Sequence, residues 1–215
     1  MPSTSRLMAT TAAGLMATAV PLSAGAAAED PAAEPWPPAS THGAFLPLPP
    51  VAYEPRTLPA CDSELTLTAG DVREVEYRAL VTEDGDTVVQ YRGAATVDVT
   101  RASDGATLDE LDVSGTGFET VSADTTTLTF DHDGPSLVIA FDEVEAAALA
   151  EAGLPEAFVH LDGTLTETVV FAGPTDEATE VPAVVSAEIT ENTTEYVFDL
   201  CDLLDQAAAP ARPGA

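Results

Sequence analysis

Hydrophobic and polar residues alternate with a period of two along most of the chain between residues 61 and 204. In one segment the apolar side of the alternation consists of Val75, Tyr77, Ala79 and Val81, and the polar side consists of Glu74, Glu76 and Arg78. The segment from Val89 to Thr100 repeats the pattern. Because successive side chains of a strand point to opposite faces of a sheet, this alternation is typical of strands with one buried face. The sequence therefore predicts a domain built mainly of β-strands.

Tight-turn signals separate the alternating segments. They are the dipeptides Asp84-Gly85, Asp104-Gly105 and Asp133-Gly134. Glycine adopts positive φ without steric penalty, so Asp-Gly favours the short turns of antiparallel hairpins. We expect further strands at 65–69, 107–113, 118–122, 125–131, 137–141 and 158–171, and two more between 184 and 201.

Two of the long predicted strands contain an interior glycine, Gly93 and Gly163. An interior glycine usually marks a bulge or a bend where a strand coils or changes sheet. This pattern does not distinguish a barrel from a sandwich.

One helix is predicted to interrupt the strands. Asp142 is a suitable N-cap and Glu145 stands at the capping-box position three residues later, while Gly153 and Pro155 end the pattern. The predicted fold class is therefore all-β, an antiparallel barrel or sandwich with one short inserted helix.

The first 28 residues have the layout of a secretory signal peptide. Arg6 precedes an uncharged apolar stretch from Leu7 to Val20, and small residues follow as far as Ala28. The alternative is an uncleaved anchor, but this stretch is short for the ~30 Å hydrocarbon core of a bilayer. We expect cleavage after Ala26 or Ala28 and a secreted or extracytoplasmic mature chain without a transmembrane anchor.

Residues 29–60 are rich in proline and alanine. Proline removes backbone donors and favours extended geometry, so this segment is interpreted as a linker. The alternative is that Trp36 and the apolar group Phe45, Leu46 and Leu48 dock on the domain or bind a partner.

Cys61 and Cys201 are the only cysteines, and they bracket the predicted domain at 61–204. In an exported protein two cysteines are more often paired than free, so we predict a structural disulfide that closes the domain. Residues 205–215 are predicted to be a disordered tail.

The chain is strongly acidic, with 37 Asp and Glu residues against 7 basic residues and a formal net charge of −30. Such a surface repels phosphate groups, which argues against nucleic-acid and anionic-membrane partners.

Catalytic motifs are not found in the sequence. It contains no Gly-x-Ser-x-Gly, His-Glu-x-x-His or Cys-x-x-Cys and no glycine-rich phosphate loop. His160 shares the polar side of its strand with Asp162, Thr164 and Thr166, which is compatible with a base oriented by an acid but is more typical of a solvated strand position. Pairs of carboxylates carry little information in so acidic a chain.

Calcium is the most defensible cofactor hypothesis. Asp84 and Asp86, and likewise Asp131 and Asp133, are two residues apart at predicted turns, and oxygen ligands in loops suit Ca²⁺. Neither pair completes a calcium-binding loop, so ordinary hairpin turns are the simpler interpretation.

These observations favour a noncatalytic binding or cell-surface module whose ligand, a small molecule or a protein, is not identified. If the domain is a barrel, its interior is either a filled core or an apolar pocket, and the inward side chains are Val75, Tyr77, Val97, Val99, Val159, Leu161 and Leu165. The alternative is a secreted hydrolase with a carboxylate or His160-centred site. A third hypothesis is that the acidity itself is an adaptation to high salt.

Overall fold

The structure is a computed structural model that describes residues 43–175 and 181–209. Antiparallel pairing joins its strands, which are β1 (Leu46–Pro47), β2 (Arg56–Ala60), β3 (Ser63–Arg73), β4 (Glu76–Val81), β5 (Thr87–Arg92), β6 (Ala95–Arg101), β7 (Thr107–Asp112), β8 (Thr116–Val121), β9 (Thr127–Asp133), β10 (Ser136–Ile139), β11 (Ala157–His160), β12 (Thr164–Phe171), β13 (Val184–Asn192) and β14 (Phe198–Asp199). The helices are the 3-10 helix η1 (Pro50–Tyr53), α1 (Glu143–Glu151) and α2 (Leu200–Ala208).

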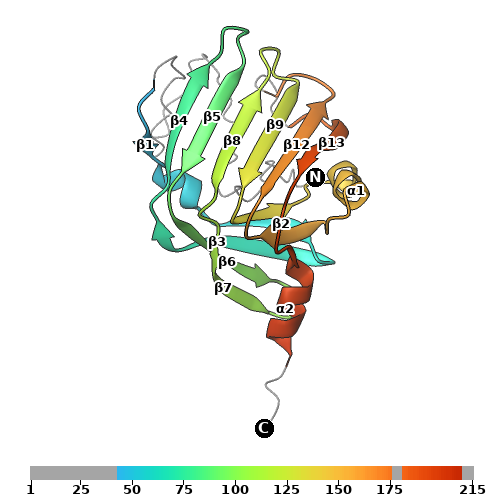
Figure 1. Cartoon of the computed structure of the whole chain (residues 1–215). Helices are drawn as coiled ribbons and strands as arrows, with labels where there is room; N and C mark the ends of the chain where they lie inside the picture. The colour runs from blue at the N-terminus through green and yellow to red at the C-terminus, as the bar shows by residue number, and fades with distance from the viewer. Residues whose placement is uncertain (1–42, 176–180, 210–215) are drawn as a thin grey trace, which may run out of the picture.

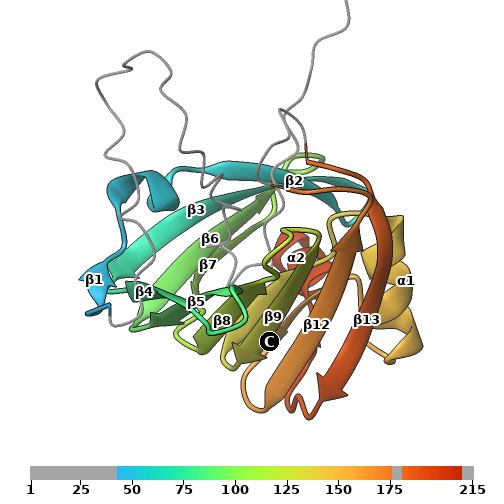
Figure 2. The same cartoon turned by 90° about the horizontal axis from the view of Figure 1, so that it is seen from above.

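The strands form three sheets. The seven-stranded sheet has the order β1-β4-β5-β8-β9-β12-β13, the four-stranded sheet β2-β3-β6-β7, and the three-stranded sheet β10-β11-β14. Figure 1 shows the seven-stranded sheet with its strands side by side, and Figure 2 shows β2 and β3 across from β9 and β12. The all-β prediction is confirmed, and of its two alternatives the fold is a sandwich rather than a closed barrel.

The chain changes sheet at the two interior glycines. Gly93 separates β5 from β6 and has a φ of +116°, and Gly163 separates β11 from β12 and has a φ of +82°. A Cβ at either position would collide with a backbone carbonyl, that of Glu74 or Thr193 respectively. The predicted strand at 158–171 is thus two strands in two different sheets, joined at the bend that Gly163 permits.

Three clusters of buried apolar residues lie behind the seven-stranded sheet in the described part of the chain, and one of them is formed by Leu128, Phe130, Val169 and Phe171 of β9 and β12. The first strands of this sheet pack on the four-stranded sheet, on the three-stranded sheet and on α2 through a cluster that includes Leu65, Leu67, Val75, Tyr77, Tyr91, Val97, Val99, Val159, Leu200 and Leu204. Its later strands pack on the three-stranded sheet and α1 through Val138, Leu149, Leu154, Phe158 and Leu165. Six of the seven side chains considered for a pocket lining or a filled core are therefore core residues, and the seventh, Leu161, is 46% exposed.

Helix α1 begins and ends as the sequence predicts. The Asp142 carboxylate accepts hydrogen bonds from the backbone N–H groups of Val144 and Glu145, at 2.9 and 3.0 Å. Gly153 follows the helix with a φ of +76°. In both views the helix lies beside β13 (Figures 1 and 2).

Helix α2 is not predicted from the sequence, and it extends into the expected tail. Asp199 caps its N-terminus by accepting from the N–H groups of Cys201 and Asp202. Leu200 and Leu204 are fully buried four residues apart, so one face of the helix packs on the core. Of the described residues, neither α1 nor α2 forms a helix with the length and apolar character needed to cross a membrane.

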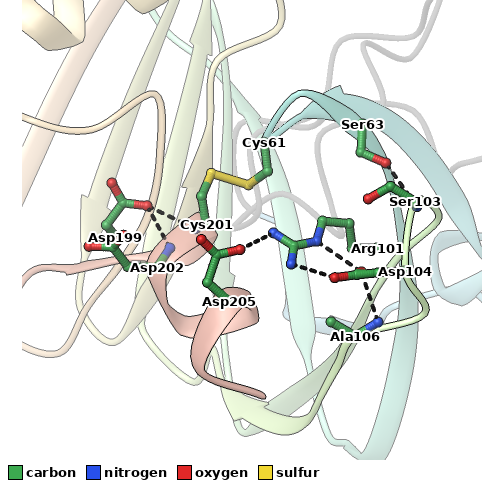
Figure 3. A network of polar contacts seen from close by, with 10 residues as sticks. All are labelled: Cys61, Ser63, Arg101, Ser103, Asp104, Ala106, Asp199, Cys201, Asp202 and Asp205. Atoms are coloured by element: carbon green, nitrogen blue, oxygen red, sulfur yellow. Dashed lines mark hydrogen bonds and ion pairs between the residues drawn. A yellow bond between two sulfur atoms is a disulfide. The ribbon is translucent and has the colours of Figure 1, made fainter. Parts of the chain in front are cut away.

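A disulfide fastens α2 to the four-stranded sheet. Cys61 and Cys201 are bonded with a Cα–Cα distance of 5.3 Å across 140 positions of sequence, which confirms the predicted pair. Beside the disulfide, Arg101 donates two hydrogen bonds to Asp104 and one of 2.7 Å to Asp205 of α2 (Figure 3). The end of the described chain is therefore tied down by a covalent bond and an ion-pair network.

The folded body begins before Cys61, so residues 43–60 are not a detached linker. Leu48 and Leu58 are buried in the core. Two guanidinium groups lie over the Phe45 ring, that of Arg78 at 4.7 Å and that of Arg92 at 3.7 Å from the ring centroid. The predicted signal peptide at 1–28, residues 29–42 and residues 210–215 lie outside the described residues.

Candidate functional site

A shallow depression opens on the outer face of the seven-stranded sheet, the face turned away from the other two sheets. It has a volume of about 410 Å³ and is lined by Thr116, Phe118, Asp131, Asp133 and Thr164. In the strand register Thr116 and Thr164 both lie opposite Asp133, and Phe118 lies opposite Asp131. Three neighbouring strands therefore present these side chains on one surface, which we call the outer depression.

The outer depression combines two carboxylates with an aromatic ring. Asp131 Oδ1 accepts a hydrogen bond of 2.6 Å from Thr166. Thr116 lies 3.5 Å from Asp133 Oδ2, a long contact. Phe118 remains 37% exposed, although it is a large apolar side chain. The depression thus offers acceptor oxygens and an aromatic face to a ligand from solvent.

The structure does not bring the two predicted calcium pairs together. Asp131 and Asp133 lie on strand β9 instead of in a turn, because pairing with β8 and β12 continues to Asp133. Asp84 is in the hairpin turn between β4 and β5, and Asp86 accepts a 2.9 Å hydrogen bond from the N–H of Ala123, which ties that hairpin to the next one. Within residues 43–175 and 181–209, no three His, Cys, Asp or Glu side chains are grouped to hold a metal ion, and calcium stays a prediction.

Acidic side chains also occupy the inner face of the same sheet. Glu119 of β8 and Glu167 of β12 lie on either side of Phe130 in register, and their exposed fractions are only 7% and 1%. Both acids stand at positions where the alternation calls for an apolar residue, as Glu167 does between Leu165 and Val169. An acid at such a position was the available sequence signal of a buried carboxyl group. Their burial is the feature that sequence reasoning missed.

Glu119 is neutral near pH 7. Burial raises the pKa of Glu119 to about 8, against the opposing effects of the Tyr91 hydroxyl and the Arg56 charge. The Tyr91 hydroxyl donates to Glu119 at 3.3 Å. An acid with so little access to water is favoured in its uncharged form.

Glu145 of α1 and Glu167 of β12 are two further buried acids, which we call the buried acid pair because the charge of Glu167 acts on Glu145. Glu145 Oε2 accepts from the N–H of Phe141 at 2.8 Å, whereas Glu167 Oε1 has no partner among the described residues. Burial, followed by the charges of Glu167 and Asp142, raises the pKa of Glu145 to about 8. Burial and Asp142 raise the pKa of Glu167 to about 7.

His132 and His160 are buried as well, and the predicted solvated position of His160 is wrong. Strand β11 belongs to the three-stranded sheet, which is covered on both faces, so His160 has no exposed surface. Burial lowers the pKa of His132 to about 3, with a further contribution from His160, and burial lowers the pKa of His160. Both rings are therefore neutral near pH 7, and their Nε2 atoms have no partner in the described part of the chain.

A small crevice lies at the N-terminus of α1, outside the buried acid pair. Its volume is about 180 Å³, and its lining includes Ala60, Phe141, Asp142 and Glu156. Asp142 is the side chain that connects this crevice with the buried acid pair, because its charge acts on both glutamates.

No family model, curated protein or solved structure matches this chain. Its function must therefore be inferred from the two acidic regions, which differ in chemistry. The outer depression is open to solvent and suits binding of a positive charge. The inner acids are shielded from water and have raised pKa values, so they suit control of structure or chemistry that needs an opening step.

Proposed function

We propose that the protein is a noncatalytic binding module that acts outside the cytoplasm and binds a cation-bearing partner in the outer depression. The signal-peptide pattern of residues 1–28 and the Cys61–Cys201 disulfide support an exported location. The observation that carries the binding proposal is the placement of Asp131, Asp133 and the half-exposed Phe118 in one open depression.

The chemistry of the depression favours an ammonium or guanidinium group. Alternate residues of a strand are about 7 Å apart, so Asp131 and Asp133 can contact two sides of one cationic group or two neighbouring ones. The face of an aromatic ring attracts the same groups through its quadrupole. A chain with a net charge of −30 also draws cations toward its surface over long distances.

Binding of a fluorescent oligo-arginine peptide and of spermidine tests this proposal. The decisive variant is Asp131→Asn/Asp133→Asn, and the matched control is Asp84→Asn/Asp109→Asn, which removes the same charge from two exposed sites elsewhere. We expect binding to weaken about 10-fold or more in the first variant, equivalent to about 1.4 kcal/mol, and less than about 2-fold in the control. Equal weakening in both would show diffuse attraction to the whole acidic surface and contradict the proposal.

A secreted hydrolase is the second candidate function, and the buried acid pair favours it. Glycoside hydrolysis uses two carboxyl groups, one of them protonated, and a raised pKa is typical of such a proton donor. The crevice at Asp142 is the nearest opening to these glutamates. The binding module remains the leading proposal because Glu145 and Glu167 are only 3% and 1% exposed.

Activity on a panel of glycosides and esters separates the two candidates. Turnover that disappears in both Glu145→Gln and Glu167→Gln, with an unchanged circular dichroism spectrum, would establish the hydrolase. Turnover that persists in both variants, or is not found, leaves these residues without a catalytic role.

A further inference from the structure

One apolar cluster on the inner face of the seven-stranded sheet is buried without an apolar partner from another layer. Its members are Leu128 and Phe130 of β9 and Val169 and Phe171 of β12, and we call them the hairpin-end cluster because they lie near the hairpin that joins β8 to β9. Their exposed fractions are 7%, 2%, 0% and 6%.

The apolar residues packed on the hairpin-end cluster within residues 43–175 and 181–209 come from one layer. They are Val121 of β8, Val184 and Ala187 of β13, and Val181 in the connection that leads into β13. The strands of a sheet flank one another but do not cover their own face, and protein interiors are close-packed. An apolar cover for side chains this well hidden therefore has to come from residues outside these ranges.

The sequence offers one suitable side chain for this cover. Residues 176–180 and 210–215 contain no large apolar residue, and residues 1–28 are expected to be removed on export. Residues 210–215 also follow α2, which lies at the bottom of Figure 1, whereas the β4–β5 and β8–β9 hairpins lie at its top. Within residues 29–42 the only large apolar residue is Trp36, which is also the single tryptophan of the sequence.

The strand register places the start of the described chain at the correct end of the sheet. Strand β1 is antiparallel to β4 and pairs Leu46 with Tyr77, near the beginning of β4. Residues before Leu46 therefore lie along the later part of β4, as the contact of Phe45 with Arg78 shows. That part of β4 leads into the β4–β5 hairpin, at the same end of the sheet as the hairpin-end cluster (Figure 1).

The segment between Trp36 and Gly43 has the length that this route requires. In the sheet order four strand spacings separate β1 from β9, which is about 19 Å along the sheet. Seven residues separate Trp36 from Gly43, and at the polyproline rise of about 3.1 Å per residue they span about 22 Å.

The composition of the segment also suits a position against an apolar face in so acidic a protein. Glu29, Asp30 and Glu34 all precede Trp36, and no acidic residue lies between Trp36 and Gly43. Pro37 and Pro38 have no backbone N–H that would need a partner on burial, and their restricted backbone lowers the entropy lost on docking.

We propose that residues 29–42 are an intramolecular strap, whose Trp36 ring docks on the hairpin-end cluster and covers it. The strap crosses from the β1 edge of the seven-stranded sheet to β9 and β12, so it closes the inner face at the end where the two hairpins lie. This inference does not depend on the binding or the hydrolase function.

NMR and fluorescence of the secreted chain, with its N-terminus established by intact mass, test the strap. Because Trp36 is the single tryptophan, its indole gives one unambiguous signal. We expect nuclear Overhauser contacts from the indole ring to the methyl groups of Leu128 and Val169. We also expect emission at shorter wavelength than in the urea-unfolded chain, and quenching by acrylamide that is several-fold slower.

Two deletions of equal length test the reach of the strap. Deletion of residues 39–42 leaves three residues between Trp36 and Gly43, which extend at most about 11 Å, so the indole contacts should be lost and the emission should shift to that of the unfolded chain. Deletion of residues 31–34 is the matched control, because it lies before Trp36 and should leave the contacts and the emission unchanged.

Three results would overturn the strap. One is the absence of indole contacts to Leu128 and Val169 in the original chain, even if the emission shows that the ring is buried elsewhere. Another is emission and quenching in the native chain equal to those of the unfolded chain. The third is equal behaviour of the two deletions, since loss or retention of the contacts in both would show that reach does not determine the position of Trp36.

Discussion

Removal of the disulfide is expected to destabilise the protein mainly through its unfolded state. The Cys61–Cys201 bond closes a loop across 140 positions. In the chain-entropy model a loop of that length contributes about 5 kcal/mol at 25 °C, an upper figure because real unfolded chains retain structure. In the folded protein, the buried Leu200 and Leu204 and the ion pair from Arg101 to Asp205 still hold α2 in place.

Urea denaturation of Cys61→Ser/Cys201→Ser measures this contribution. We expect the free energy of unfolding to fall by about 3 to 5 kcal/mol with an unchanged native circular dichroism spectrum. The reduced original chain is the matched control and should reach the same midpoint as the variant. A loss below about 1 kcal/mol would refute the expectation that the loop closure dominates, and a changed native spectrum would show that α2 needs the bond to fold.

Three further changes test separate parts of the structure. Glu119 is protonated in the folded state but ionised in the unfolded state between about pH 4.5 and 8, so its burial makes the free energy of unfolding fall as the pH rises. In Glu119→Gln this fall should be shallower by about 1.4 kcal/mol per pH unit. If the stability curves of variant and original chain from thermal melts run parallel across this pH range, the prediction is wrong. Gly163→Ala should cost about 2 kcal/mol or more through its positive φ and the collision with Thr193, whereas Gly173→Ala, with open space around it, should cost little in the same urea assay. Phe45→Ala should remove about 1 to 2 kcal/mol of contact with Arg78 and Arg92 and speed proteolytic cleavage within residues 43–60, and equal cleavage rates would argue against this docking.

Local patterns predicted the local structure well, because they report directly on backbone geometry. The alternation before Val81 and after Val89 corresponds to β4 and β5, and the cap at Asp142 begins α1. Gly93 and Gly163 were expected at bends and lie where the chain changes sheet. The partition into three sheets depends on contacts between strands far apart in sequence, and no local pattern encodes it.

The missed elements have identifiable causes. Helix α2 has a cap at Asp199 and apolar residues at Leu200 and Leu204, but it is short and follows directly on strand β14. The packing of residues 43–60 on the domain was underestimated, because proline favours extended structure whether or not a segment packs. Phe45 and Leu48 show that it packs only once their contacts with Arg92 and with the core are known.

The candidate site could be predicted only in part. Asp131 and Asp133 were singled out for their spacing, but the neighbouring Phe118 and Thr164 join them only through strand pairing. The buried acids were not predicted, since so many acidic residues hide the few that are shielded. An acid at an apolar position of the alternation, such as Glu167, is the signal to seek in comparable chains.

The most direct test of the proposed function is an NMR titration of the isotopically labelled protein with spermidine at about 0.15 M salt, where diffuse attraction is screened beyond about 8 Å. Binding in the outer depression predicts saturable shifts concentrated at Thr116, Phe118, Asp131, Asp133 and Thr164. Small, non-saturating shifts spread over acidic residues of the whole surface would contradict it.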